Sequence, residues 1–122
     1  MLLDSNAIIY SVKPEFAALR QLIAERNPAV SAISYLEVLG YHQLTESDQQ
    51  DFIEFFETAQ IIPVSQPVLD QAVALRQQRK MSLGDSIIAA TALLNSLTLV
   101  TANIADFRRI QGITLMNPLT DL

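Results

Sequence analysis

Short, largely apolar runs separated by segments of helix length restrict the fold of this sequence more than any other feature. The runs cover residues 1–3, 29–33, 61–64, 97–100 and 113–116, and none shows strict alternation of apolar and polar residues. Strands without alternation are covered on both faces, which is typical of a parallel sheet connected by helices. The pattern predicts an α/β fold, a three-layer α/β/α sandwich around a central, mostly parallel sheet.

Capping residues mark where the intervening helices begin and end. Asp4 or Ser5 suits the start of a first helix that ends at Pro14, and Ser34 suits the start of the helix after the second run. The segment 85–94 is almost wholly apolar, so we expect a helix that is buried on most sides.

Chain length and residue usage exclude several classes of protein. At 122 residues the chain is expected to form one domain over 1–122. It has no cysteine and a single histidine, which excludes disulfide scaffolds, thiol nucleophiles and zinc sites built from several nitrogen or sulfur ligands. Its three glycines are too far apart for a glycine-rich phosphate loop.

The first residues reach Asp4 without a basic region, which argues against an export signal and predicts a cytoplasmic protein. Between Asp85 and Asp106 no residue is charged, a length close to that of a membrane span. Polar residues at Asn95, Ser96 and Asn103 interrupt this segment. We therefore expect a buried helix followed by a turn and a strand, and no contact with a membrane.

The formal charge of −5, from eight basic and thirteen acidic residues, is unusual for a chain that contacts nucleic acid. If four acids formed one metal site, the remaining charges would be nearly balanced. The basic residues fall into two groups, one of Arg76, Arg79 and Lys80 and one of Arg108 and Arg109. Such groups are typical of a solvated helix face.

Four acids stand near predicted helix starts. Asp4 ends the first strand, Glu37 follows the second and Asp106 follows the run at 97–100, so three belong to the edge where open α/β sheets bind ligands. Asp85 begins the apolar helix. Each of the last three has another explanation, because Ser34–Glu37, Ser82–Asp85 and Asn103–Asp106 fit the capping box of a helix.

As a set, four carboxylates at one sheet edge would repel one another. Each pair about 4 Å apart costs roughly 4 kcal/mol at an effective dielectric constant near 20. Protonation or a cation must offset this cost, and oxygen ligands without histidine or cysteine select Mg²⁺ or Mn²⁺. The corresponding chemistry is hydrolysis of a phosphodiester by metal-activated water.

At these residues the sequence resembles the PIN-domain ribonucleases, and in particular the VapC-like toxins of type II toxin–antitoxin pairs. The resemblance covers the whole chain. The matching segments are Leu2–Asn6, Ser34–Glu37, and a stretch from Met81 to Asp85 that continues through Ile88–Ala92, Leu97–Thr101, Asn103, Asp106–Phe107 and Asn117–Pro118.

The resemblance implies a Mg²⁺- or Mn²⁺-dependent endoribonuclease that acts on RNA, is neutralised by a small cognate antitoxin protein and forms a homodimer. It also implies an acidic quartet of Asp4, Glu37, Asp85 and Asp106, with Ser5, Thr101 and Asn103 as supporting polar groups. Asp4 and Asp85 would be metal ligands, and Asp106 would bind the metal directly or through an intervening group. Glu37 would accept a proton through water.

Ala102 departs from the pattern, since many relatives have arginine between the threonine and the asparagine. This leaves open a non-catalytic alternative, a PIN-like module that binds proteins. A receiver-type phosphoacceptor is a further alternative, but it needs a lysine near the last strands, and the only lysines are Lys13 and Lys80.

Overall fold

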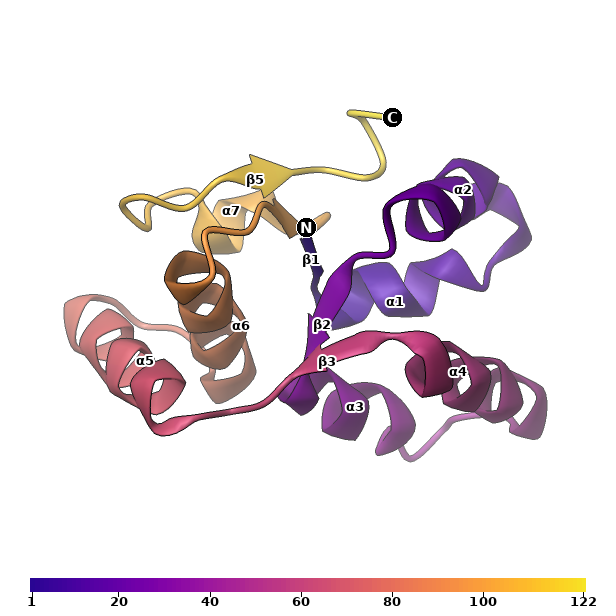
Figure 1. Cartoon of the computed structure of the whole chain (residues 1–122), viewed down its shortest axis with the longest axis horizontal. Helices are drawn as coiled ribbons and strands as arrows, with labels where there is room; N and C mark the ends of the chain where they lie inside the picture. Colours follow the sequence, from indigo (N-terminus) through magenta and orange to yellow (C-terminus); the bar gives the residue numbers. More distant parts are fainter.

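The computed structural model describes all residues from 1 to 122. Five short strands and seven α-helices alternate along the chain (Figure 1). In order they are β1 (Leu2–Leu3), α1 (Ser5–Ser11), a 3₁₀ turn (Pro14–Phe16), α2 (Ala17–Arg26), β2 (Ala29–Ser31), α3 (Ala32–Leu39), α4 (Glu46–Thr58), β3 (Gln60–Ile62), α5 (Gln66–Gln78), α6 (Leu83–Leu94), β4 (Leu99–Val100), α7 (Ile104–Phe107) and β5 (Leu115–Met116).

All strand pairs are parallel, in the order β3-β2-β1-β4-β5. From β1 the chain adds β2 and then β3 on one side of β1, and β4 and β5 follow on the other side. Strand β3 is therefore an edge strand, as Pro63 predicts. The order therefore reverses between β1 and β4, and ligands of open α/β sheets bind outside the carboxyl ends of the strands at such a point.

Successive strand residues send their side chains to opposite faces of the sheet. Leu2 and Leu99 belong to a core with α5, α6 and α7, whereas Leu3 and Val100 belong to a second core with α1, α3 and α4. Figure 1 shows the two helical layers on opposite sides of the sheet, with α5 and α6 on one side and α1, α2 and α4 on the other. The three-layer α/β/α prediction is confirmed, and the sheet is wholly parallel.

Three predicted helix boundaries differ from the structure, since α1 ends at Ser11 before Pro14, α6 begins at Leu83 before Asp85, and α3 begins before Ser34. Ser31, rather than Ser34, is the N-cap, and its hydroxyl accepts a hydrogen bond from the Ile33 N–H at 3.2 Å. Ser31 is the last residue of β2, so strand and helix follow without a loop. Ser34 is instead buried within the helix.

The uncharged segment between Asp85 and Asp106 contains α6 followed by β4, as expected, and ends in the first residues of α7. None of the helices combines the length and the apolar character that crossing a membrane requires.

Candidate functional site

Asp4 lies at the end of β1, beside the point where the strand order reverses. Its side chain is 4% exposed, and both oxygens have partners: Oδ1 accepts from the Ala7 N–H at 2.7 Å, and Oδ2 accepts from the Thr101 hydroxyl. Thr101 follows β4, so this last bond joins the ends of the two central strands. The Thr101 hydroxyl also accepts from the Asn103 N–H at 3.0 Å.

Burial raises the pKa of Asp4 above its ordinary value of 3.8. The hydrogen bonds from Thr101 and Ala7 oppose this rise, while the negative charges of Asp85 and Glu37 add to it. A carboxyl group with two good hydrogen bonds usually has a lowered pKa. The raised pKa therefore means that burial and like charges outweigh the N-cap and threonine bonds.

Glu37 reaches the site from the C-terminal half of α3 and is exposed. The Ser5 hydroxyl, in the first turn of α1, donates to Glu37 Oε1 at 2.7 Å and lies 2.9 Å from the Ser34 hydroxyl. On its other side, the carboxylate packs against Gly84 in the first turn of α6. Glu37 is therefore held between two helix N-termini that are distant in sequence.

Asp85 lies in the first turn of α6, where the Ser82 hydroxyl accepts a hydrogen bond from its backbone N–H at 3.1 Å. Partial burial raises the pKa of the Asp85 carboxyl group, and the negative charges of Asp106 and Glu37 raise it further. The Ser82 side chain lowers it. Asp85 therefore interacts electrostatically with each of the other three acids, since it also raises the pKa of Asp4.

Asp106 lies in the short helix α7 and is exposed. It shares with Asp85 the wall of a groove of about 790 Å³ that opens between the C-terminal end of α5 and the residues after α7. The Asn103 side chain makes no capping bond to α7, so the predicted capping box of Asn103 and Asp106 is not formed.

The three capping alternatives differ in outcome. Ser82 caps α6 as the sequence predicts. The Ser34–Glu37 box is wrong, because α3 begins before Ser34 and Glu37 lies in the second turn of the helix. Capping therefore does not explain why the carboxylate of Glu37 faces α1 and α6.

The four acids are close enough to interact electrostatically. No group of three or more His, Cys, Asp or Glu side chains, however, is close enough to hold a metal ion. The chemistry of the donors fits Mg²⁺ or Mn²⁺, because carboxylates with nearby hydroxyls suit hard ions. Mg²⁺ in particular retains several waters and binds through one or two carboxylates, so it needs no cage of three protein ligands. Burial raises the pKa values of Asp4 and Asp85, and the neighbouring carboxylates raise them further, so a cation would also be favoured here.

Two residues beside the site were missed by sequence reasoning. Ser34 contacts Ser5, and its position three residues before Glu37 on a helix face was the available signal. Gly84 makes room for Glu37, which no local pattern predicts.

Comparison with known proteins places the chain in a family. A model of the PIN domain matches residues 1–113. The solved structures that match include a toxin–antitoxin complex from Klebsiella pneumoniae, with 32% identity, 96% of each chain covered and a TM-score of 0.77. VapBC2 from Rickettsia felis, bound to a DNA fragment from its promoter, has 25% identity, 95% and 96% coverage and a TM-score of 0.79. FitAcB from Neisseria gonorrhoeae has 27% identity, 98% coverage of both chains and a TM-score of 0.76.

No curated protein matches the chain in sequence. The chain belongs to the PIN domain family and is a VapC-like member of it.

Proposed function

We propose that this chain is a Mg²⁺- or Mn²⁺-dependent endoribonuclease and the toxin of a toxin–antitoxin pair. The observation that carries the proposal is the gathering of Asp4, Glu37 and Asp85 at the carboxyl ends of the strands, with the pKa values of both aspartates raised in part by neighbouring carboxylates. Helix capping does not require carboxylates to lie close enough to repel one another. A site that binds a cation next to a phosphodiester does require closely spaced carboxylates, which repel one another when no cation is bound.

The acids take different roles in this proposal. Asp4 and Asp85 are the residues that would hold the metal, since Asp85 lies within electrostatic reach of every other member of the set and Asp4 is rigidly oriented by its two hydrogen bonds. Asp106 would hold it with them or through water. The metal would supply a water of lowered pKa and stabilise charge on the phosphate.

Glu37 would accept the proton of the attacking water. Its Oε1 is occupied by the Ser5 hydroxyl, which leaves Oε2 on the side of Gly84 and Asp85. Ser5 and Ser34 would hold this orientation, and Thr101 would hold that of Asp4. Asn103 is exposed at the start of α7, where its side chain would contact the substrate.

The cleavage test uses a panel of structured RNAs with and without Mg²⁺. We expect cleavage by the parent that stops in excess EDTA and is abolished by Asp4→Asn and by Asp85→Asn. Asp51→Asn, an exposed aspartate of α4, is the matched control and should cut like the parent. Cleavage that persists in EDTA would remove the metal from the proposal, and an active Asp4→Asn or Asp85→Asn variant would remove that residue.

The fold of Asp4→Asn should persist because asparagine retains an oxygen that accepts from the Ala7 N–H. The variant makes a weaker contact with the Thr101 hydroxyl, but it also removes the buried negative charge of Asp4, and the second effect offsets the first in the free energy of unfolding.

A small antitoxin is the proposed protein partner, because one of the solved structures that share this fold is a toxin–antitoxin complex. An apolar groove of about 450 Å³ beside Glu37 suits such a partner. It is lined in part by Ile9, Val12, Val38, Tyr41, Leu44 and Phe52. Co-expression with the protein encoded by the adjacent reading frame, followed by co-purification, tests this; a chain that purifies alone and cleaves RNA equally in the presence of that protein would contradict it.

We also propose a homodimer. Leu69 and Val73 of α5 and Leu83 of α6 are 41%, 56% and 64% exposed, respectively, and border one shallow pocket. A dimer would bury this apolar surface. Sedimentation at micromolar concentration should show a dimer that Val73→Asp dissociates, and a parent that sediments as a monomer would refute it.

A further inference from the structure

Two groups of cations that are separate in sequence line one groove in the structure. Arg76, at the end of α5, lies with Arg79 and Lys80 on one wall, and Arg108 and Arg109, which follow α7, lie on the other. Five of the eight basic residues of the chain therefore line a single groove. The expectation that each group is simply a solvated helix face does not account for this convergence.

The groove joins the acidic site on one side only. Asp85 and Asp106 line it, with cations outnumbering carboxylates five to two, whereas Glu37 borders the apolar groove beside α1 and α4. Only Met81 and Ala105 add hydrophobic side chains to the basic groove. A polyanion that enters the acidic site would therefore meet compensating charge in one direction from it.

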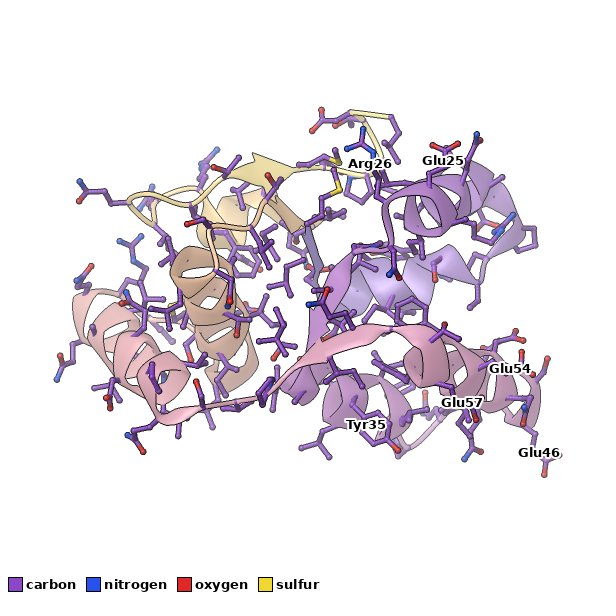
Figure 2. All side chains as sticks on the ribbon, in the orientation of Figure 1. Glu25, Arg26, Tyr35, Glu46, Glu54 and Glu57 are labelled. Atoms are coloured by element: carbon purple, nitrogen blue, oxygen red, sulfur yellow. The ribbon has the colours of Figure 1, made fainter.

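Negative charge gathers on the opposite face of the sheet. Helix α4 carries Glu46, Asp48, Asp51, Glu54 and Glu57, and Figure 2 shows its labelled glutamates pointing away from the protein. Figure 1 places α4 across the sheet from α5 and α6. The charged residues are thus unevenly distributed, with an acidic face on α4 and a basic groove on the other side of the sheet. The net charge of −5 therefore does not argue against an anionic ligand in the groove.

Arg79 has the most unusual environment of the five cations. Its side chain is half-buried, and its Nε is buried without a hydrogen-bond partner. A buried donor without an acceptor is unfavourable, and an anionic oxygen that reached this guanidinium would satisfy it. Arg76, by contrast, is held in place by a bond from its Nε to the Met81 carbonyl at 3.3 Å.

We propose that this groove binds successive phosphates of single-stranded RNA on one side of the scissile bond, with Arg79 as its central contact. The proposal rests on the proposed function, because it takes RNA as the substrate of the acidic site. The low apolar content of the groove favours a phosphate backbone over an acidic protein segment, which would need apolar anchors to bind.

The test measures binding of a fluorescent decauridine to the full chain by anisotropy, in EDTA, between 50 and 200 mM salt. For single strands the slope of log K against log salt is about −0.7 per neutralised phosphate. Arg79→Gln should weaken binding about tenfold at 100 mM salt and reduce the slope by about 0.7. The double variant Arg108→Gln/Arg109→Gln should reduce it by about 1.4.

Arg26→Gln is the matched control, because Arg26 is exposed at the end of α2 and does not line the groove. Figure 2 shows Arg26 on α2, on the other side of the molecule from α5. The Arg26→Gln variant should bind like the parent. Arg79→Lys, which keeps the charge, should retain most of the slope but lose affinity, and equal circular dichroism and melting temperatures verify that each variant is folded.

Groove variants that bind no more weakly than Arg26→Gln would overturn the proposal. It would also be overturned if a decaglutamate peptide displaced the RNA at equal charge concentration with the same dependence on Arg79, since the groove would then suit an acidic protein segment. Binding in EDTA requires no cleavage. RNA that binds in the groove but is never cut would refute only the proposed function. If the chain cleaves RNA but the groove variants bind it as tightly as the parent does, only this inference is refuted.

Discussion

The carboxylate of Glu37 packs directly against the backbone of Gly84, at a place where a side chain on residue 84 would have to lie. A Cβ built there would be 2.5 Å from Glu37 Oε2. The two residues belong to helices α3 and α6, so the absence of a side chain at Gly84 lets the proton-accepting group proposed here approach Asp85. The contact makes Gly84 a positioning residue for Glu37.

Gly84→Ala should therefore reduce RNA cleavage while preserving the fold. The atom that must move is the end of a flexible side chain, and alanine is favoured over glycine in a helix by up to about 1 kcal/mol. We expect an unchanged or higher melting temperature and a fall in kcat of about tenfold or more, in the range of a misplaced general base.

A double-mutant cycle separates this effect from a general change in α6. If Gly84 acts through Glu37, adding Gly84→Ala to Glu37→Gln should cause almost no further loss, because the two changes affect the same group. If the fold decreases in kcat of the two single variants multiply in the double variant, Gly84 affects cleavage for a reason other than its contact with Glu37.

Thr101 should contribute to stability through the bond that joins the ends of β1 and β4. Thr101→Val keeps the shape of the side chain but leaves Asp4 Oδ2 and the Asn103 N–H without their partner. An unsatisfied buried group costs about 1–3 kcal/mol, so the free energy of unfolding in denaturant should fall by that amount.

Thr58→Val is the matched control for this change. Thr58 is exposed at the end of α4, where its hydroxyl bonds to the Phe55 carbonyl at 3.3 Å, and its loss should alter stability by less than about 0.5 kcal/mol. Equal destabilisation by the two valine substitutions would contradict a special role for Thr101.

Strand and helix order could be predicted from the sequence because each element carries its own signal. Continuous apolar runs mark the strands, and Ser82 caps α6 as expected. The start of α3 could not be predicted, because Ser31 and Ser34 are both good N-caps by local chemistry. Pairing of β2 with β1 and β3 makes Ser31 the end of a strand and hence the cap.

The site was predictable to the extent that topology dictates it. Acids after parallel strands must share one edge of the sheet, and Asp4 and Glu37 do interact. By contrast, the meeting of Arg79 with Arg108 depends on how the end of α5 and the loop after α7 approach each other. No periodicity within either segment encodes that approach, which is why the two basic groups resembled separate solvated faces.

The raised pKa values of Asp4 and Asp85 predict how stability depends on pH in the metal-free protein. Each carboxyl group has an ordinary pKa of 3.8 and a higher one in the folded chain, so the folded state holds its proton more tightly. As pH rises from about 3.8 through the folded pKa, the unfolded chain releases protons first, and the free energy of unfolding falls.

Asp85→Asn removes one such group. In EDTA, the stability of this variant relative to the parent should therefore increase between pH 4 and pH 7, as measured by urea unfolding. Asp51→Asn serves as the control for loss of a negative charge alone. A difference between Asp85→Asn and the parent that stays constant over this range would show that Asp85 has no raised pKa.

Binding of a divalent metal should oppose this destabilisation, because a cation compensates the buried negative charge and the repulsion that together raise both pKa values. A metal at ten times its Kd stabilises the folded state by about 1.4 kcal/mol, which corresponds to an increase in Tm of roughly 5 °C. MgCl₂ or MnCl₂ should produce such a rise in the parent and in Asp51→Asn, measured by differential scanning calorimetry against NaCl at equal ionic strength. The rise should be much smaller in Asp85→Asn, since that variant loses both a proposed ligand and the repulsion between Asp85 and the other acids. Equal shifts in Asp85→Asn and the parent would place the metal elsewhere on the chain, and the acidic face of α4 would then be the first region to test with charge-neutralising variants.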